Sequence, residues 1–408
     1  MTEIGRRSRF PSLAGLLRLR RETIDAHPRR YVKMLLVVLG VLVVWNAVAN
    51  WPFLVARLQA VAVLDKVGGQ PIPVPLRWLA TEPVKTQELT LDLPSGAVRA
   101  RMYTPVNHPH APGMVLVHGV HYLGMNEPRL EAFASAMAGC GLRVLTPELS
   151  NIKDYHIGPS SIASIGDTAT WMAHASGDRP VGVMGLSFSG SLSLLAAAEP
   201  RYKRDIKFVV AVGSEDAMSR VANYYLTGRA LRPTGDAEML APHEYGALVL
   251  EYENLEDFVP KPDRNAVRLV LRNHLYEDLA GERAAFAKLT PMQRVEARQL
   301  MDTTSPKTRE MIAASDQRHA AEMASVSPDG QLATLAAPVF LLHGEGDNII
   351  PSTETQWLEK DVPKDDMQAS LISPVISHLD LDGKAPGFRD QWELIHFFAK
   401  ILHAAEAR

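Results

Sequence analysis

The sequence predicts an α/β protein with a mostly parallel sheet and helices on both faces. Two observations support this fold class: short unbroken apolar runs recur along the chain, and helix-like stretches lie between them. A short run that is apolar at every position is typical of a strand buried on both faces of a sheet. Strands and helices that alternate in this way predict a doubly wound arrangement. The apolar runs occupy residues 114–117, 142–145, 181–184, 208–212 and 339–342, and the helix-like stretches occupy 128–138, 160–175 and 189–198.

A hairpin is predicted before the buried strands, and a long helical insertion is predicted between two of them. Polarity alternates over residues 88–92 and 98–103 around a Pro-Ser-Gly turn, which is typical of a hairpin with one solvated face. Residues 218–328 then break the strand–helix rhythm with mostly helical periodicity. We interpret this stretch as a helical cap, with the core formed by 86–217 and 329–408. A separate helical domain with its own partner is the alternative.

The start of the chain predicts a membrane anchor. Residues 1–33 carry nine Lys or Arg and three Asp or Glu, whereas the rest of the chain has 34 basic and 43 acidic side chains. Residues 34–56 contain no charged side chain, and 23 residues of helix reach about 34 Å, which is enough to cross a bilayer. The positive-inside rule keeps the basic tail in the cytoplasm. We therefore expect a single-pass protein of the cytoplasmic membrane with its body on the extracytoplasmic side.

Two alternatives to the anchor are open. The segment Ala47-Val48-Ala49 matches a small-x-small cleavage site, so a cleaved signal peptide would also export the body. A purely soluble protein is the second alternative. Residues 57–85 are rich in proline and are expected to form a connector. The acidic body repels a phosphate backbone, so nucleic acid is not an expected partner.

A serine stands at the bend between a predicted strand and a predicted helix. A serine held in a strained strand-to-helix turn needs very small residues two positions away, because the two backbones approach closely there. Gly185 meets this need before Ser187, and Ser189 stands where a glycine is usual. We predict that Ser187 is a nucleophile. The other nearby serines, Ser189, Ser191 and Ser193, fall on the following helix and are interpreted as cap and packing residues.

A serine hydroxyl needs a base to take its proton and a carboxylate to orient that base. Asp347 follows a buried strand in a glycine-flanked turn, and His378 follows a further predicted strand that starts at Leu371. Both stand where later strands end, and the order along the chain is serine, aspartate, histidine. We predict Asp347 and His378 as the partners of the serine. Glu345 is the alternative carboxylate, and His343 or His396 is the alternative base.

An acyl intermediate also needs hydrogen-bond donors for its oxyanion. The backbone N–H of Phe188, directly after the predicted nucleophile, is one expected donor. The backbone N–H of Val120, in the loop after the first buried strand, is the other. His121 and Tyr122 follow in this loop and are candidates to line the substrate pocket. We expect no metal site, because the histidines near this loop stand on both sides of a strand and no metal-binding or nucleotide-binding motif occurs.

Four motifs occur in order along the chain: Val115-Leu-Val-His118-Gly119, Gly185-Leu-Ser187-Phe-Ser189-Gly190, Leu342-His-Gly-Glu-Gly-Asp347 and Ser377-His378. With these motifs the chain resembles the α/β-hydrolase superfamily from about Gln87 to Ala405. It looks most similar to the serine esterase, dienelactone hydrolase and prolyl oligopeptidase-like branches. The resemblance implies an acyl-serine mechanism without a metal or an organic cofactor. Ser189, and Val120 where some esterases carry a run of glycines, depart from the pattern, and residues 1–86 lie outside it.

These observations predict a membrane-anchored serine hydrolase that acts on a small-molecule or lipid-like acyl substrate. The same triad can cleave esters, thioesters and amides. A carboxylic ester is placed first only because it is the commoner substrate. The alternative is a catalytically inactive, membrane-tethered protein that binds a lipid or a protein through the cap, because function resides in a site and not in a fold.

Overall fold

The computed structural model of the protein describes residues 28–376 and 387–406. The chain divides into two compact units at the peptide between Leu54 and Val55. The smaller unit holds helix α2 (Pro28–Ala49) and the first residues of α3 (Trp51–Val67). The larger unit holds everything that follows, so the predicted core and the predicted cap belong to one compact body.

The membrane-spanning helix predicted over residues 34–56 is not found. Within the residues that the structure describes, no helix is long and apolar enough to cross a membrane. The uncharged run is divided between two helices, because α2 ends at Ala49 and α3 begins at Trp51. Pro52 stands in the first turn of α3, a position where proline is tolerated and the previous helix cannot continue. Ala56, the last residue of the run, lies within the larger unit and is buried in its hydrophobic core.

The connector predicted over residues 57–85 is largely helical. Helix α3 continues to Val67 and is followed by α4 (Val74–Ala80), which starts at a proline-rich turn. Ala60 and Val63 of α3 are fully buried in the same hydrophobic cluster as Ala80 of α4. The segment therefore contributes to the core of the larger unit, and its prolines mark the start of a helix.

Eight strands of the described chain form one sheet, in the order β1-β2-β4-β3-β5-β6-β9-β10. The strands are β1 (Val84–Leu93), β2 (Gly96–Pro105), β3 (Gly113–Val117), β4 (Arg143–Pro147), β5 (Val181–Leu186), β6 (Ile206–Val212), β9 (Val339–Gly344) and β10 (Met367–Ser373). Strand β2 pairs antiparallel with β1 and with β4, and all other neighbours are parallel. The predicted α/β class, the opening hairpin and the five apolar strands are confirmed.

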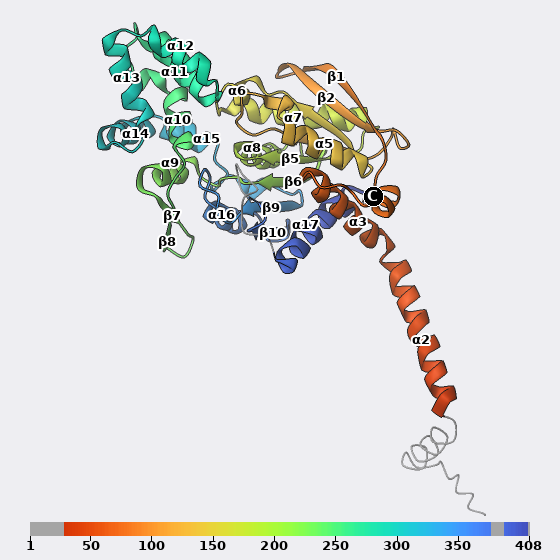
Figure 1. Cartoon of the computed structure of the whole chain (residues 1–408). Helices are drawn as coiled ribbons and strands as arrows, with labels where there is room; N and C mark the ends of the chain where they lie inside the picture. Colours follow the sequence, from red (N-terminus) through yellow and green to blue (C-terminus); the bar gives the residue numbers. More distant parts are fainter. Residues whose placement is uncertain (1–27, 377–386, 407–408) are drawn as a thin grey trace, which may run out of the picture. The chain divides into compact units, whose positions relative to one another are not determined.

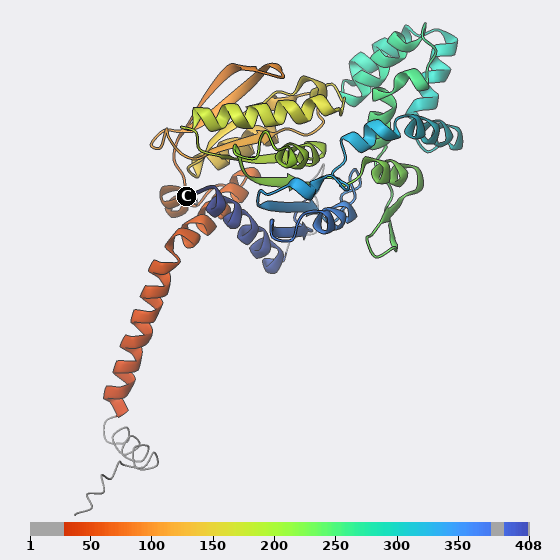
Figure 2. The same ribbon diagram turned by 180° about the vertical axis from the view of Figure 1, so that it is seen from behind.

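Helices cover both faces of the sheet (Figures 1 and 2). Side chains alternate between the faces of a strand, so Val115 and Val117 of β3 belong to one core and Met114 and Leu116 to the other. The first core includes α7 (Pro159–Ala175) and α8 (Phe188–Ala198), and the second includes α3, α5 (Pro128–Gly139) and α17 (Phe388–Glu406). This is why the central strands read as unbroken apolar runs. Two shorter helices, α6 (Ser150–Lys153) and α16 (Thr353–Asp361), follow β4 and β9.

The insertion between β6 and β9 is coloured green to teal in Figure 1. It contains α9 (Met218–Thr227), α10 (Glu244–Glu253), α11 (Arg264–Leu275), α12 (Leu279–Ala287), α13 (Pro291–Met301), α14 (Pro306–Arg318) and α15 (Ala320–Ser325). It is not wholly helical, because β7 (Arg229–Leu231) and β8 (Ala237–Met239) form a small antiparallel hairpin between α9 and α10. We keep the name cap for residues 218–328; the interpretation of this stretch as a cap and not a separate domain stays a prediction.

Candidate active site

Ser187 occupies a strained turn between β5 and α8. Its backbone has φ 56° and ψ −138°, a region that costs a non-glycine residue on the order of 1–3 kcal/mol. The neighbouring backbone holds this turn: the Ser187 N–H donates to the Val212 carbonyl at 2.7 Å, and the Ser187 carbonyl accepts from Ser214 Oγ at 2.9 Å. The Ser187 side chain makes no capping hydrogen bond to α8. The predicted strand–turn–helix setting of this serine is therefore present.

The small residues around Ser187 are required by close backbone approach. A Cβ added at Gly185 would lie 2.2 Å from the Ser189 carbonyl oxygen, and one added at Gly190 would lie 1.9 Å from Ser214 Oγ. Ser189, which stands where a glycine is usual, is fully buried and donates from Oγ to the His118 carbonyl at 2.6 Å. Its departure from the motif thus adds a hydrogen bond between α8 and the end of β3.

The loop after β3, residues 118–122, lies directly against Ser187; we call it the oxyanion loop after the role predicted for it. A Cβ added at Gly119 would be 3.2 Å from Ser187 Cβ. Val120 follows Gly119 and is buried, and Phe188 follows Ser187 at the N-terminus of α8. Val120 and Phe188, the two residues predicted to donate to an oxyanion, therefore each directly follow one of the two residues in this contact. Their role as donors stays a prediction.

His118 holds the oxyanion loop to the end of β4. Its Nε2 accepts from the Leu149 N–H at 3.0 Å, so its Nδ1 carries the proton and donates to the Gly119 carbonyl at 2.8 Å. Burial lowers the pKa of His118 to about 4, which keeps the ring neutral in this tautomer near neutral pH. Sequence reasoning did not assign this role; a histidine directly before the glycine of the loop is the signal that could have found it.

Asp347 is buried in the turn that follows β9. Its Oδ1 accepts from the backbone N–H groups of Ile349 at 2.9 Å and Ile350 at 3.0 Å, which fixes the carboxylate in place. Only 2% of Asp347 is exposed, whereas the alternative carboxylate, Glu345, is exposed. The geometry favours Asp347 as the orienting carboxylate.

His378, the predicted base, lies outside the described residues. Strand β10 ends at Ser373, earlier than the sequence suggested, and Ser373 is paired with Gly344 at the end of β9. The described chain therefore leaves the sheet beside the turn of Asp347. Of the alternative bases, His343 is fully buried and its ring nitrogens lie 2.6 Å from Thr355 Oγ1 and 2.8 Å from the Ile350 carbonyl oxygen. Both nitrogens thus have partners in α16 and in the turn after β9, and Nε2 also lies 3.4 Å from Asp347 Oδ2.

His396, the other alternative base, lies in α17. Burial and the nearby positive charges of Lys400 and Arg57 lower its pKa. Both of these neighbours belong to the helices that cover the second face of the sheet, α17 and α3. The charged partners that shift the pKa of His396 thus lie on the face of the sheet that α3 and α17 cover.

The predicted pocket residues, His121 and Tyr122, join the oxyanion loop to the cap. Their rings stack at 4.8 Å between centroids, and Tyr122 stacks on Tyr276, after α11, at 5.0 Å. Both residues are half-buried, and burial lowers the pKa of His121. The structure therefore places them under cap aromatic residues, and their contact with a substrate stays a prediction.

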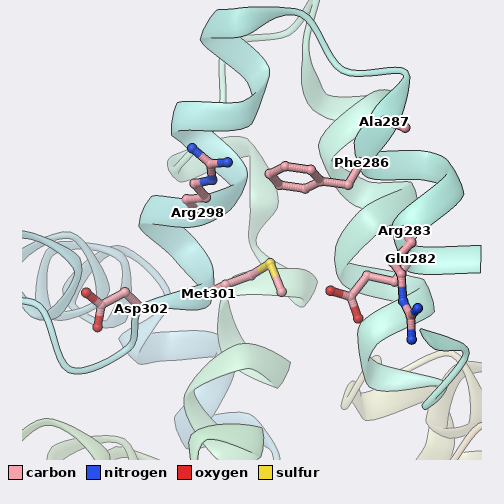
Figure 3. A pocket seen from close by; sticks show the side chains of 7 residues that line it. All are labelled: Glu282, Arg283, Phe286, Ala287, Arg298, Met301 and Asp302. Atoms are coloured by element: carbon pink, nitrogen blue, oxygen red, sulfur yellow. The ribbon is translucent and has the colours of Figure 1, made fainter. Parts of the chain in front are cut away.

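A cavity of about 480 Å³ opens within the cap between α12 and α13 (Figure 3). Its lining residues are Glu282, Arg283, Phe286, Ala287, Arg298, Met301 and Asp302. The guanidinium of Arg298 lies 5.3 Å from the centre of the Phe286 ring. None of the residues predicted for the catalytic site lines this cavity.

A buried ion-pair network, which sequence reasoning missed, lies where the cap begins. Arg220 of α9 donates to Glu354 Oε1 and to Asp216 Oδ2, both at 2.7 Å. Within the described chain, Asp216, Asp329 and Asp361 bring carboxylate oxygens within 4.8 Å of one another, a spacing that a cation could occupy. Because Arg220 already neutralises the buried Asp216 carboxylate, we assign the group a structural role.

The strand order and the positions of the serine turn and the aspartate turn identify the fold. The serine turn follows β5 and the aspartate turn follows β9, on strands that flank β6 in one parallel sheet. A serine on a sharp strand-to-helix turn, followed later in the chain by the acid, is the arrangement of this superfamily. This is the α/β-hydrolase fold. The resemblance noted from the sequence is confirmed at that level.

The chain is similar to several solved structures at low sequence identity. We found no protein-family model and no curated protein sequence that matches the chain. Among solved structures, an esterase of Pyrobaculum calidifontis is 16% identical, with a TM-score of 0.41 over 85% of this chain and 90% of that one. Carboxyl esterase 2 of Tuber melanosporum is 19% identical, with a TM-score of 0.42 over 78% of this chain and 88% of the other.

A third similar structure is a hydrolase with a different substrate in its name. The 2-hydroxy-6-oxo-6-phenylhexa-2,4-dienoate hydrolase of Rhodococcus sp. strain RHA1 is 17% identical, with a TM-score of 0.40 over 71% of this chain and 91% of its own. At these identities the likeness concerns the fold alone, and neither substrate nor mechanism passes from those proteins to this one.

Proposed function

We propose that this protein is a serine hydrolase that cleaves a carboxylic ester through an acyl-enzyme intermediate on Ser187. The observation that carries the proposal is the strained turn of Ser187, with Gly119 of the oxyanion loop packed against it. Backbone strain held by several hydrogen bonds is characteristic of functional sites. The buried Asp347 carboxylate at the end of β9 supplies the acid that such a site needs.

In the proposed mechanism, His378 takes the proton of Ser187 as the hydroxyl attacks the carbonyl carbon of the substrate, and Asp347 orients the histidine and stabilises its charged form. The carbonyl oxygen becomes an oxyanion that accepts hydrogen bonds from the N–H groups of Phe188 and Val120. His378 then returns the proton to the departing alcohol. Water, activated by the same histidine, releases the acid and restores the serine.

The substrate class is a small-molecule or lipid-like acyl ester. Thioesters and amides are open to the same chemistry, and they rank after esters only because esters are the commoner substrates of this triad. No residue of this chain is assigned to a cofactor in the proposed mechanism.

The direct test is labelling with a fluorophosphonate probe, which forms a covalent bond to an activated serine. We expect the full chain to be labelled and the Ser187→Ala variant to remain unlabelled, with Ser191→Ala as the control that keeps the label. Ser191 is a suitable control because its Oγ donates to the Glu215 carbonyl and it lies inside α8. Equal labelling of wild type and Ser187→Ala would refute the assignment. A wild type that is neither labelled nor active on esters, thioesters and amides would favour a binding protein.

We further propose that the N-terminal region attaches the enzyme to the cytoplasmic membrane, with the catalytic body on the extracytoplasmic side. The support is the basic charge of residues 1–33 and the apolar surface of α2, where Leu35 is 67% and Trp45 is 72% exposed. A run of exposed apolar side chains on one helix is costly in water and calls for an apolar environment. We expect the full chain to stay with membranes washed in alkaline carbonate. A soluble full chain contradicts this proposal, and a soluble body that lacks its first residues indicates a cleaved signal peptide.

A further inference from the structure

The oxyanion loop is fixed by hydrogen bonds to two successive peptide groups, one from the core and one from the cap. From the core, His118 Nδ1 donates to the Gly119 carbonyl at 2.8 Å. From the cap, the Tyr245 hydroxyl donates to the Val120 carbonyl at 2.8 Å. Carbonyl and N–H point in opposite directions across a planar trans peptide. The first bond therefore sets the direction of the Val120 N–H, and the second prevents the next peptide from rotating.

Tyr245 is itself held in place by contacts on both sides. It stands in the first turn of α10, where the His243 side chain accepts from the Tyr245 N–H at 3.2 Å. The His243 N–H donates to the carbonyl of Asn348, directly after Asp347, at 2.9 Å. Gly246, the next residue of α10, packs on the Tyr225 ring so closely that a Cβ there would lie 2.3 Å from Tyr225 Cζ. One short segment of the cap thus contacts the turn of the acid and the loop of the oxyanion donor.

The Tyr245 phenol is suited to donate at any working pH. Its ring packs edge-on against Tyr155 at 5.9 Å between centroids, and Tyr155 is fully buried and donates to the Leu275 carbonyl at 2.8 Å. Burial and the neighbouring Tyr155 raise the pKa of Tyr245 well above its ordinary value. The hydroxyl therefore remains protonated, and the Val120 carbonyl keeps its partner.

We propose that Tyr245 is a positioning residue: it holds the peptide that follows Val120, keeps in place the Val120 N–H that His118 orients for oxyanion binding, and so couples the seating of the cap to catalysis. This inference rests on the proposed function. The Tyr245 hydroxyl bonds a backbone carbonyl and does not touch the reacting atoms. Its removal leaves the aromatic ring in the cluster and frees the loop. The loss then falls on the transition state, in which the oxyanion is formed, and not on binding of the ground-state ester.

The test compares Tyr245→Phe with Tyr252→Phe in the full chain. Tyr252 is the matched control because it lies in the same helix and the same aromatic cluster, and its hydroxyl contacts Asp154 at 3.4 Å, a residue outside the oxyanion loop. With a p-nitrophenyl ester, we expect Tyr245→Phe to lower kcat about tenfold or more and to leave KM and Tm close to wild type. The rate of fluorophosphonate labelling should fall in parallel. Tyr252→Phe should leave all four quantities near wild type.

Each other result overturns the inference. Equal kcat in the two variants shows that the hydroxyl of Tyr245 does not position the loop. A rise in KM without a loss of kcat makes Tyr245 a substrate-binding residue, and a fall in kcat that is matched by a lower Tm makes it a packing residue. A wild type without labelling or hydrolysis refutes the proposed function, and this inference with it. An active, labelled wild type with an unaffected Tyr245→Phe refutes this inference alone.

Discussion

At the scale of single residues, the site depends on groups whose chemical identity cannot be exchanged. Glycine is needed at 185 because a side chain would enter the backbone of α8. A neutral histidine is needed at 118 because one ring nitrogen donates and the other accepts. Both residues act on the serine turn or the oxyanion loop without themselves reacting.

The substitution Gly185→Ala should destabilise the protein by about 3 kcal/mol, because the new methyl group would meet the Ser189 carbonyl and the Gly190 Cα, which are backbone atoms that cannot rotate away. Denaturant unfolding of the purified variant measures this. Gly158→Ala is the control, since nothing lies within 4 Å of a Cβ there and its φ is −134°. Similar losses in the two variants would show that close packing at Gly185 is not the cause.

His118 should make the protein sensitive to mild acid. Burial depresses the pKa of its ring to about 4 from 6.5, so the unfolded chain binds more protons than the folded chain between these values. Stability is therefore complete above pH 6.5 and falls as the pH drops toward 4, by about 3 kcal/mol at most. We expect His118→Asn to show a smaller loss of unfolding free energy between pH 7 and pH 4.5. Equal losses in the two proteins would contradict this assignment.

At the scale of the secondary-structure elements, the helix that carries Tyr245 also carries an unpaired buried acid. Glu251 of α10 is fully buried, and neither of its carboxylate oxygens has a hydrogen-bond partner among the described residues. Burial raises its pKa well above the ordinary value. Glu253, two residues later, is different because it accepts from the Ile157 N–H at 2.8 Å.

Replacing Glu251 by leucine should stabilise the protein by about 1–3 kcal/mol, because an unsatisfied buried polar group is removed. For an acid with a raised folded pKa, stability is complete below the unfolded pKa and is lost as the pH rises, since the unfolded chain then releases a proton that the folded chain keeps. The gain in Glu251→Leu should thus be larger at pH 8 than at pH 5. Chemical unfolding at both values measures it. Glu253→Leu, which leaves the Ile157 N–H unpaired, should destabilise instead, and a gain in both variants would contradict this explanation.

At the scale of the whole larger unit, the cap is fastened to the core by buried polar contacts where the chain enters and leaves it. Arg220 at the start of the cap pairs with Glu354 of α16, whose Oε2 also accepts from the backbone of Asp216 and Ala217. The Met218 N–H donates to Ser327 Oγ at 2.9 Å, which joins the two crossings. The cap is therefore expected to unfold together with the core.

Breaking the pair with Arg220→Met should cost about 3–5 kcal/mol, because the Glu354 carboxylate, only 1% exposed, would lose its counter-charge. The double variant Arg220→Met/Glu354→Gln should recover part of this loss, since the Glu354 charge is then absent and only the Asp216 carboxylate has lost its partner. Calorimetry of the two variants and the wild type measures both steps. A double variant no more stable than the single one would show that charge pairing is not the main contribution.

The sequence was sufficient to predict the central strands of the sheet and the turn at Ser187. The five central strands are buried on both faces and so are apolar at every position, and the turn at Ser187 requires a glycine whose spacing is visible in the sequence. Patterns of this kind can be recognised in the sequence because they depend on residues that are close together in the chain. The uncharged run over 34–56 has the same apolar composition whether its side chains face lipid or a protein core, and Ala56, at its end, is buried in the second core.

Other features were decided only by contacts between distant segments. Tyr245 and Val120 are 125 residues apart, and nothing in the sequence of either indicates that one hydroxyl meets the other's carbonyl. The Arg220–Glu354 pair, 134 residues apart, is of the same kind. The sequence by itself thus determined the central strands of the sheet and which serine stands at the bend, because strand burial and turn strain leave periodic and local signatures. Only the tertiary structure decided how the cap holds the oxyanion loop, because hydrogen bonds between distant segments leave no such signature.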